Sequence, residues 1–141
     1  MMAVLVRDGR FQPVHDVAFA SPEAANARFI ELPGDADPAM LGDRLGSIEA
    51  IRVVFPAFSD GRFLSLGARL RRMGFAGRLR AVGPLLADQY PMALRCGFDE
   101  IEITDEHAAR IPEVQWADAM ARLPLNYQDR LRTRAAVRKA A

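Results

Sequence analysis

The feature that most constrains the fold is the apolar run AIRVVF, residues 50–55, which opens a regular alternation of strand-like and helix-like segments. Further strand-like runs follow at residues 79–82 and 100–103, and amphipathic stretches fill the intervals. Such spacing is typical of parallel strands, because these need long crossover connections. AIRVVF lacks the polar alternation of a half-exposed strand, so we expect both of its faces to be covered. The sequence predicts a small layered α/β domain with a mainly parallel sheet and flanking helices; an incomplete or decorated barrel is the alternative.

The two ends of the chain differ from its centre. VLVRDGRFQPV carries Asp8-Gly9 between β-prone runs, which predicts a β-hairpin, and we expect it at an edge of the sheet. Residues 129–141 hold five basic side chains and one acidic side chain. We therefore expect one α/β domain over residues 1–128 and a flexible basic tail that docks an acidic partner or is merely solvated.

Three helices are expected from apolar spacing over residues 37–46, about 59–73 and 112–123. Asp37 can cap the first of them, and Pro38 suits its first position. Gly67 would let the second helix approach the sheet closely. The residues expected to face the core in the first two helices are Met40, Leu41, Leu45, Phe63, Leu66, Gly67, Leu70 and Met73.

A fourth helix is expected between Gly83-Pro84 and Gly97, with Pro91 kinking it. Gly97 should take the left-handed conformation that ends a helix, and Phe98 should pack back. Gln89 lies on the apolar face, so its amide needs a partner: nearby backbone, a neighbouring loop or a ligand. The residues on that face are Leu85, Leu86, Gln89, Met92, Ala93 and Cys96.

Composition excludes several classes of function. A net charge of +1 gives no general attraction to nucleic acid or anionic membranes, and no apolar run approaches the about 20 residues that span a bilayer. With a single cysteine and two distant histidines, the sequence predicts no metal site and no cofactor of its own. Cys96 is expected to be a structural thiol, and the lone cysteine and the absence of a signal-peptide pattern indicate the cytoplasm.

The loop FSDGR, residues 58–62, is the main candidate for binding chemistry. It should lie with Gly83 at the carboxyl ends of the strands, where open parallel sheets bind ligands. Arg62 and two helix N-termini would attract a sulfate, phosphate or carboxylate, although Asp60 could simply cap its helix. The sequence lacks the phosphate-binding patterns GxxxxGK[ST] and GxGxxG. The residues predicted to converge in a shallow anion site are Ser59, Asp60, Arg62, Gly83 and Gln89.

FPAFSDGR followed by GRLRAVGPLLADQYPMALRCGFDEIEI resembles a proteobacterial family, the domain of unknown function 934. The resemblance covers about residues 1–128. The chain departs from the family pattern in FLSLGAR, where Arg69 is either the family's arginine shifted by one position or not its equivalent, and at Pro91. Besides Asp60, Arg62, Gly83 and Gln89, the positions that carry the resemblance are Phe55, Pro56, Phe58, Gly61, Arg80, Asp88, Arg95, Cys96, Gly97, Phe98 and Asp99.

The resemblance implies a role beside assimilatory sulfite or nitrite reductase and the reductase for activated sulfate, near which members are encoded. The family is loosely labelled oxidoreductase, with no accepted reaction, so whether the chain is an enzyme stays open. Three interpretations follow. The chain is an accessory protein that binds or assists a reductase, a small enzyme acting on an anionic metabolite at the strand ends, or a homodimeric scaffold.

Overall fold

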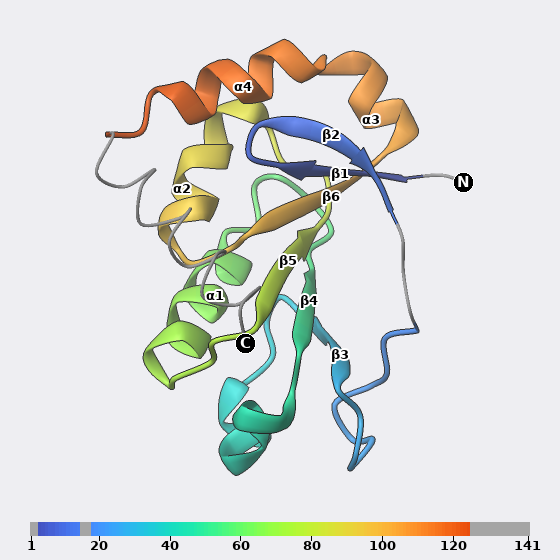
Figure 1. Cartoon of the computed structure of the whole chain (residues 1–141), viewed down its shortest axis with the longest axis vertical. Helices are drawn as coiled ribbons and strands as arrows, with labels where there is room; N and C mark the ends of the chain where they lie inside the picture. The colour runs from blue at the N-terminus through green and yellow to red at the C-terminus, as the bar shows by residue number, and fades with distance from the viewer. Residues whose placement is uncertain (1–2, 15–17, 125–141) are drawn as a thin grey trace.

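A computed structural model describes residues 3–14 and 18–124 and has a six-stranded sheet at its centre, in the order β2-β1-β6-β5-β4-β3 (Figure 1). The strands are β1 (Ala3–Arg7), β2 (Arg10–Pro13), β3 (Phe29–Pro33), β4 (Ala50–Val54), β5 (Arg78–Val82) and β6 (Glu100–Thr104). Strands β3 to β6 are parallel, and β1 runs antiparallel to both β6 and β2. The predicted mainly parallel α/β sheet with a hairpin at one edge is confirmed, and the sheet is open.

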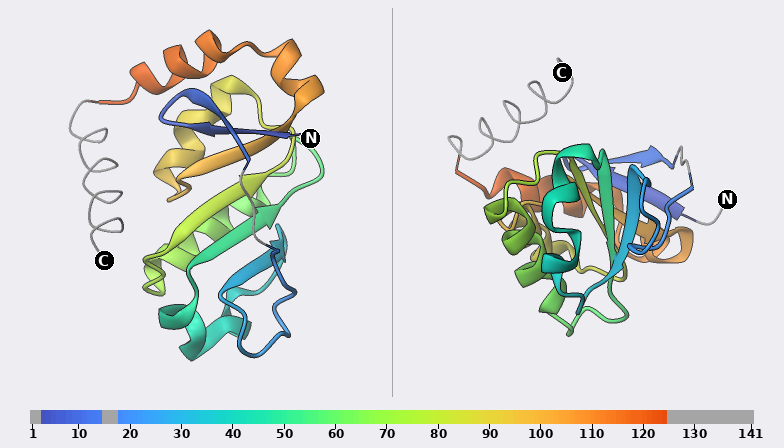
Figure 2. Two further views of the ribbon diagram at one scale, coloured as in Figure 1. Left: turned by 45° about the vertical axis from the view of Figure 1, so that its right-hand side comes forward. Right: turned by 90° about the horizontal axis from the view of Figure 1, so that it is seen from below.

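The helices connect and flank these strands. They are the 3-10 helix η1 (Pro38–Ser47), α1 (Arg62–Arg72), the short 3-10 helix η2 (Ala87–Gln89), α2 (Tyr90–Arg95), α3 (Asp105–Arg110) and α4 (Glu113–Ala121). The parallel strands lie in sequence order and crossovers between them are right-handed, so η1, α1 and α2 fall on one side of the sheet (Figure 2).

The core lies between these helices and the sheet. On β4, Ile51 and Val53 are fully buried, and they face Phe63 and Leu70 of α1 within one hydrophobic cluster. The rings of Phe55 and Phe63 stack with their centroids 3.9 Å apart. This contact holds the end of β4 against the start of α1, the point from which the FSDGR loop projects.

The opposite side of the sheet carries charged residues instead of helices. Glu100 is completely buried, with its Oε2 accepting from Arg80 Nε at 2.7 Å and its Oε1 accepting from Arg7 Nη2 at 2.6 Å. Glu102 Oε1 accepts from Arg80 Nη1 at 3.0 Å and from Arg52 Nη1 at 3.3 Å. We call this set, with Glu31, which accepts from Arg52 Nε at 2.7 Å, the ion-pair ladder.

Phe19 covers part of the ion-pair ladder. Its ring centroid lies 5.3 Å from Arg52 Cζ and 5.5 Å from Arg80 Cζ, within the range of cation–π contact. The prediction that both faces of β4 are covered therefore holds only in part. Helices bury one face, whereas Arg52 and Val54 on the other remain partly exposed.

Several details of the predicted helices are wrong. Asp37 does cap, accepting from the Ala39 N–H at 3.0 Å, but the segment is a 3-10 helix broken at Gly42, where φ is +38°. Met40, expected on the core side of this helix, is 49% exposed. Met73, the residue that follows α1, is likewise exposed.

The segment after Gly83 also differs from the prediction. Regular α-helix begins only at Tyr90, so Pro91 lies in the first turn of α2, where a missing N–H causes no kink. Leu86 and Met92 face solvent instead of the core. Gly97 has φ of +102°, as predicted, and ends the helix.

The C-terminal part of the chain also differs from the prediction. The helix expected at 112–123 is α4, whereas α3, which follows β6 directly, was not expected from the sequence. The proposed tail, residues 129–141, lies outside the described residues. Among the residues that are described, no helix has the length and apolarity needed to cross a membrane.

Candidate functional site

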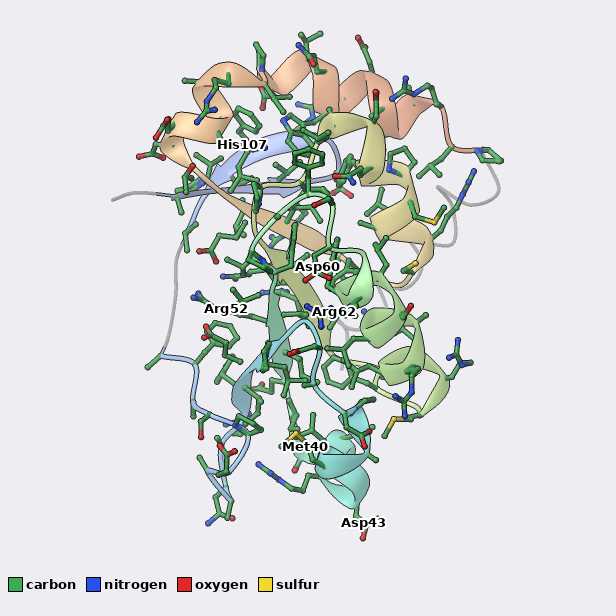
Figure 3. The ribbon with its side chains drawn as sticks, turned by 180° about the vertical axis from the view of Figure 1, so that it is seen from behind. Met40, Asp43, Arg52, Asp60, Arg62 and His107 are labelled. Atoms are coloured by element: carbon green, nitrogen blue, oxygen red, sulfur yellow. The ribbon has the colours of Figure 1, made fainter. Side chains whose placement is uncertain are left out.

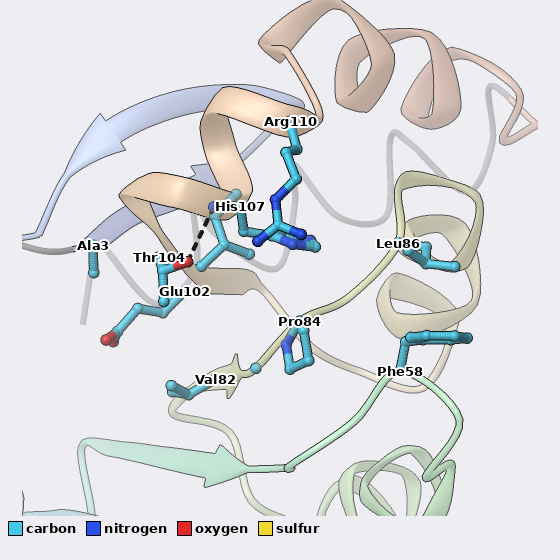
Figure 4. A pocket seen from close by; sticks show the side chains of 11 residues that line it. Ala3, Phe58, Val82, Pro84, Leu86, Glu102, Thr104, His107 and Arg110 are labelled. Atoms are coloured by element: carbon cyan, nitrogen blue, oxygen red, sulfur yellow. Dashed lines mark hydrogen bonds between the residues drawn. The ribbon is translucent and has the colours of Figure 1, made fainter.

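The carboxyl ends of the four parallel strands meet at one edge of the sheet, and a cleft of about 510 Å³ opens there beside β5 and β6 (Figure 4). Ligands of open parallel sheets bind at this edge. The residues lining the cleft are Ala3, Phe58, Val82, Gly83, Pro84, Leu86, Glu102, Ile103, Thr104, His107 and Arg110.

Gln89 fixes the loop that carries Phe58. Its Nε2 donates to the Phe58 carbonyl at 2.8 Å, and its Oε1 accepts from the Leu86 N–H at 2.9 Å. Both ends of the amide are therefore bonded to backbone, one of them in the neighbouring loop. The partners that the Gln89 amide needs are backbone groups, and no ligand is required to satisfy it. The Phe58 side chain remains 51% exposed, although the backbone of its loop is bonded to Gln89.

Asp60 and Arg62 form a closed pair at the start of α1 (Figure 3). Arg62 Nε and Nη2 donate to the two carboxylate oxygens of Asp60 at 3.0 and 2.8 Å. Hydrogen bonds from the side chain and backbone of Arg62 lower the pKa of Asp60 to about 2. Arg62 also lies 3.6 Å from Asp35, so two carboxylates already occupy the cation that was expected to bind an anion.

The five predicted site residues thus fall into two groups. Gly83 lines the cleft, and a Cβ at this position would lie 2.5 Å from the Phe55 carbonyl oxygen, so a glycine lets the two chain segments approach. Asp60 and Arg62 pair beside the cleft, with exposed Ser59 on the same loop. Gln89 connects the two groups through Phe58.

Two cleft residues, His107 and Arg110, were missed because no helix was expected between the strand at 100–103 and the helix at 112–123. The missed signal is Thr104, whose Oγ1 accepts from the His107 N–H at 3.1 Å and caps α3. His107 Nε2 lies 2.6 Å from the Leu85 carbonyl oxygen. A carbonyl only accepts, so Nε2 carries the proton, and the ring is fixed in one orientation.

Several family-motif positions build the fold. Gly97 and Asp99 hold Arg71, which donates to the Gly97 carbonyl at 2.8 Å and to Asp99 Oδ2 at 2.9 Å. Phe98 is fully buried, and Cys96 is partly buried, which raises the pKa of its thiol. The RCGFD segment is therefore a clasp between α1 and the start of β6, and the structural role expected for Cys96 agrees with this position.

Other motif positions do not contribute to the core. Pro56, Phe58, Gly61, Asp88 and Arg95 are exposed. Asp88 lies 3.4 Å from Arg122 of α4. Phe55 is buried in the core and Arg80 belongs to the ion-pair ladder. Some motif residues therefore stabilise the fold and others lie on the surface. Phe58 is the large apolar side chain among the exposed ones.

No group of three or more His, Cys, Asp or Glu side chains arranged to hold a metal ion occurs within the part of the chain that the structure describes.

Comparison with known proteins gives one match. Residues 29–138 match the sequence model of a family described as bacterial protein of unknown function (DUF934). No curated protein and no solved structure matches the chain. The matched segment runs from β3 through the whole parallel part of the sheet and includes FSDGR, Gln89 and the RCGFD clasp. The chain therefore belongs to the DUF934 family of bacterial proteins.

Proposed function

We propose that the protein is a cytoplasmic accessory component of assimilatory sulfur reduction that binds a partner reductase and carries no redox cofactor of its own. The family resemblance supports the pathway. The observation that carries the binding role is Phe58, which is 51% exposed on a loop fixed by Gln89 at the carboxyl edge. An exposed aromatic side chain on a preorganised loop is the kind of group that dominates protein interfaces.

The ionisable groups at this edge also favour binding over catalysis. Asp60 is held by Arg62, and the Nε2 of His107 by the Leu85 carbonyl. A general acid or base needs a group free to exchange a proton with a substrate. A small enzyme acting on an anionic metabolite is the second candidate, favoured by the position of the cleft at the strand ends.

Growth experiments test the pathway. Deleting the gene should impair growth on sulfate and spare growth on cysteine. A plasmid encoding the wild-type chain or Met92→Ala should restore growth, whereas Phe58→Ala should not. Met92 is a matched control, because it is also an exposed apolar residue, at 49%, and does not line the cleft. Equal growth of the deletion strain on both sulfur sources would refute the proposed role.

Binding experiments test the partner. The purified chain should bind purified sulfite reductase, and Phe58→Ala should weaken the complex about tenfold or more, the usual cost of truncating an interface anchor. Sedimentation of the chain alone would reveal a homodimer, the third interpretation. A stoichiometric flavin or metal in the purified protein would favour the enzyme instead.

A further inference from the structure

The cleft beside β5 and β6 has the size and lining of a small-molecule site. Its volume of about 510 Å³ lies in the range of ligand pockets, roughly 300–1,000 Å³. Ala3, Val82, Pro84 and Ile103 give it an apolar lining. Phe58 and Leu86 lie together on one side, opposite Thr104 and Glu102 (Figure 4). A flat apolar group can therefore fit between the ring of Phe58 and the aliphatic residues that line the cleft.

Arg110 supplies the cleft with hydrogen-bond donors. Its guanidinium extends from α3 into the cleft next to His107 (Figure 4). Nη2 donates to Glu106 Oε1 at 2.6 Å. Nε and Nη1 have no hydrogen-bond partner among the residues that the structure describes. A guanidinium presents five donors and commonly binds more than one oxygen group.

The other polar groups of the cleft restrict the ligand further. Glu102 is engaged by Arg52 and Arg80 in the ion-pair ladder. His107 is fixed by its bond to Leu85 and by the edge-on ring of Trp116, 6.5 Å away between centroids. The positively charged donors of Arg110 thus lie beside the hydrogen-bonded ring of His107 and face the apolar lining of the cleft.

We propose that the cleft binds a small planar apolar molecule bearing one carboxylate, the class of aromatic and heteroaromatic carboxylic acids. The ring lies on the apolar lining beside Phe58, and the carboxylate accepts from Arg110. The site goes beyond the proposed function, because it operates in the purified chain without a partner protein.

The test uses 2-naphthoate and its uncharged counterpart 2-naphthalenemethanol, titrated into the full chain by calorimetry and amide NMR. 2-Naphthoate should bind with a Kd of about 0.1–1 mM, as expected for a ligand of this size, and shift the amide signals of Gly83 and Thr104. The alcohol should bind about tenfold more weakly, because it lacks the charge-assisted hydrogen bond.

Two pairs of variants separate the contributions. Arg110→Gln should reduce the affinity for 2-naphthoate to that for the alcohol, whereas Arg122→Gln, at another exposed, ion-paired arginine, should change nothing. Phe58→Ala should weaken both ligands and Met92→Ala neither. Arg110 and Phe58 are exposed, so these variants should fold.

Other outcomes would overturn the site. These are no binding of 2-naphthoate at millimolar concentration, equal affinity for acid and alcohol, or equal effects of Arg110→Gln and Arg122→Gln. A peptide ending in phenylalanine with a free carboxylate is a further arm. Binding of that peptide ten times tighter than 2-naphthoate would reassign the cleft to the chain end of a protein partner. Failure in any of these arms would leave the sulfur-growth experiment unaffected.

Discussion

Tyr90 shows at the level of one residue how the N-terminal hairpin is joined to the rest of the fold. Its hydroxyl accepts from the Gly9 N–H at 3.1 Å, and its ring packs edge-on against Trp116. Burial raises the pKa of Tyr90 to about 12. The neutral form therefore contributes stability that is complete below the unfolded pKa of about 10 and is lost as the pH rises towards 12.

Absorbance titration at 295 nm tests this assignment. The chain has two tyrosines, so subtracting the curve of Tyr90→Phe from the wild-type curve isolates Tyr90. The difference should titrate near pH 12, and the free energy of unfolding should fall more steeply above about pH 10 in the wild type than in the variant. A difference curve centred at about pH 10 would mean that Tyr90 is solvated.

At the level of secondary-structure elements, the clasp around Arg71 fixes the end of α1 against the sheet. Arg71 donates to the carbonyls of Phe75, Gly77 and Gly97 and to Asp99. Arg71→Ala should lower the free energy of unfolding by about 3 kcal/mol, because the partly buried Asp99 carboxylate and the three carbonyls lose this charged donor. Urea denaturation measures the loss. Arg72→Ala, one position along the exposed side of α1, should cost less than about 0.5 kcal/mol.

Local features of these elements could be predicted from the sequence. Gly67 was expected to allow close helix packing, and a Cβ there would lie 2.5 Å from Phe98 Cε2. The left-handed Gly97 and the strands β4 to β6 were likewise identified from nearby residues. Helix α3 escaped detection because its six residues include no buried one, so no apolar spacing marks it.

Features that depend on strand register could not be predicted. Arg80 and Glu100 are opposite one another only because β5 and β6 pair in the observed register. The cleft likewise combines residues from Ala3 to Arg110, and no local pattern indicates that they meet. The sequence placed the five candidate site residues at the carboxyl edge of the sheet, whereas the pairing of Arg62 with Asp60 and Asp35 depends on the fold.

The ion-pair ladder connects the molecule as a whole, because Glu100 of β6 bonds Arg7 of β1 and Arg80 of β5. Glu100→Gln should lower the free energy of unfolding by about 3–5 kcal/mol, since it removes one of the two carboxylates that pair with the buried Arg80. Glu49→Gln, which breaks the exposed pair with Arg28, should cost less than about 1 kcal/mol. Guanidinium-free denaturation in urea is the appropriate measurement. Equal losses for both variants would mean that the ladder is solvated.

The antiparallel placement of β1 against β6 has a practical consequence. Ala3 pairs with Thr104 at the carboxyl end of β6 and lines the cleft. A group fused ahead of residue 1 is tethered to Ala3 by a linker of only a few ångströms per residue, which gives it an effective concentration near millimolar at the cleft. An N-terminal affinity tag would lie within reach of the cleft, so the titrations require untagged protein. The same geometry makes the N-terminus the position from which a weakly bound compound can be tethered and trapped for crystallography.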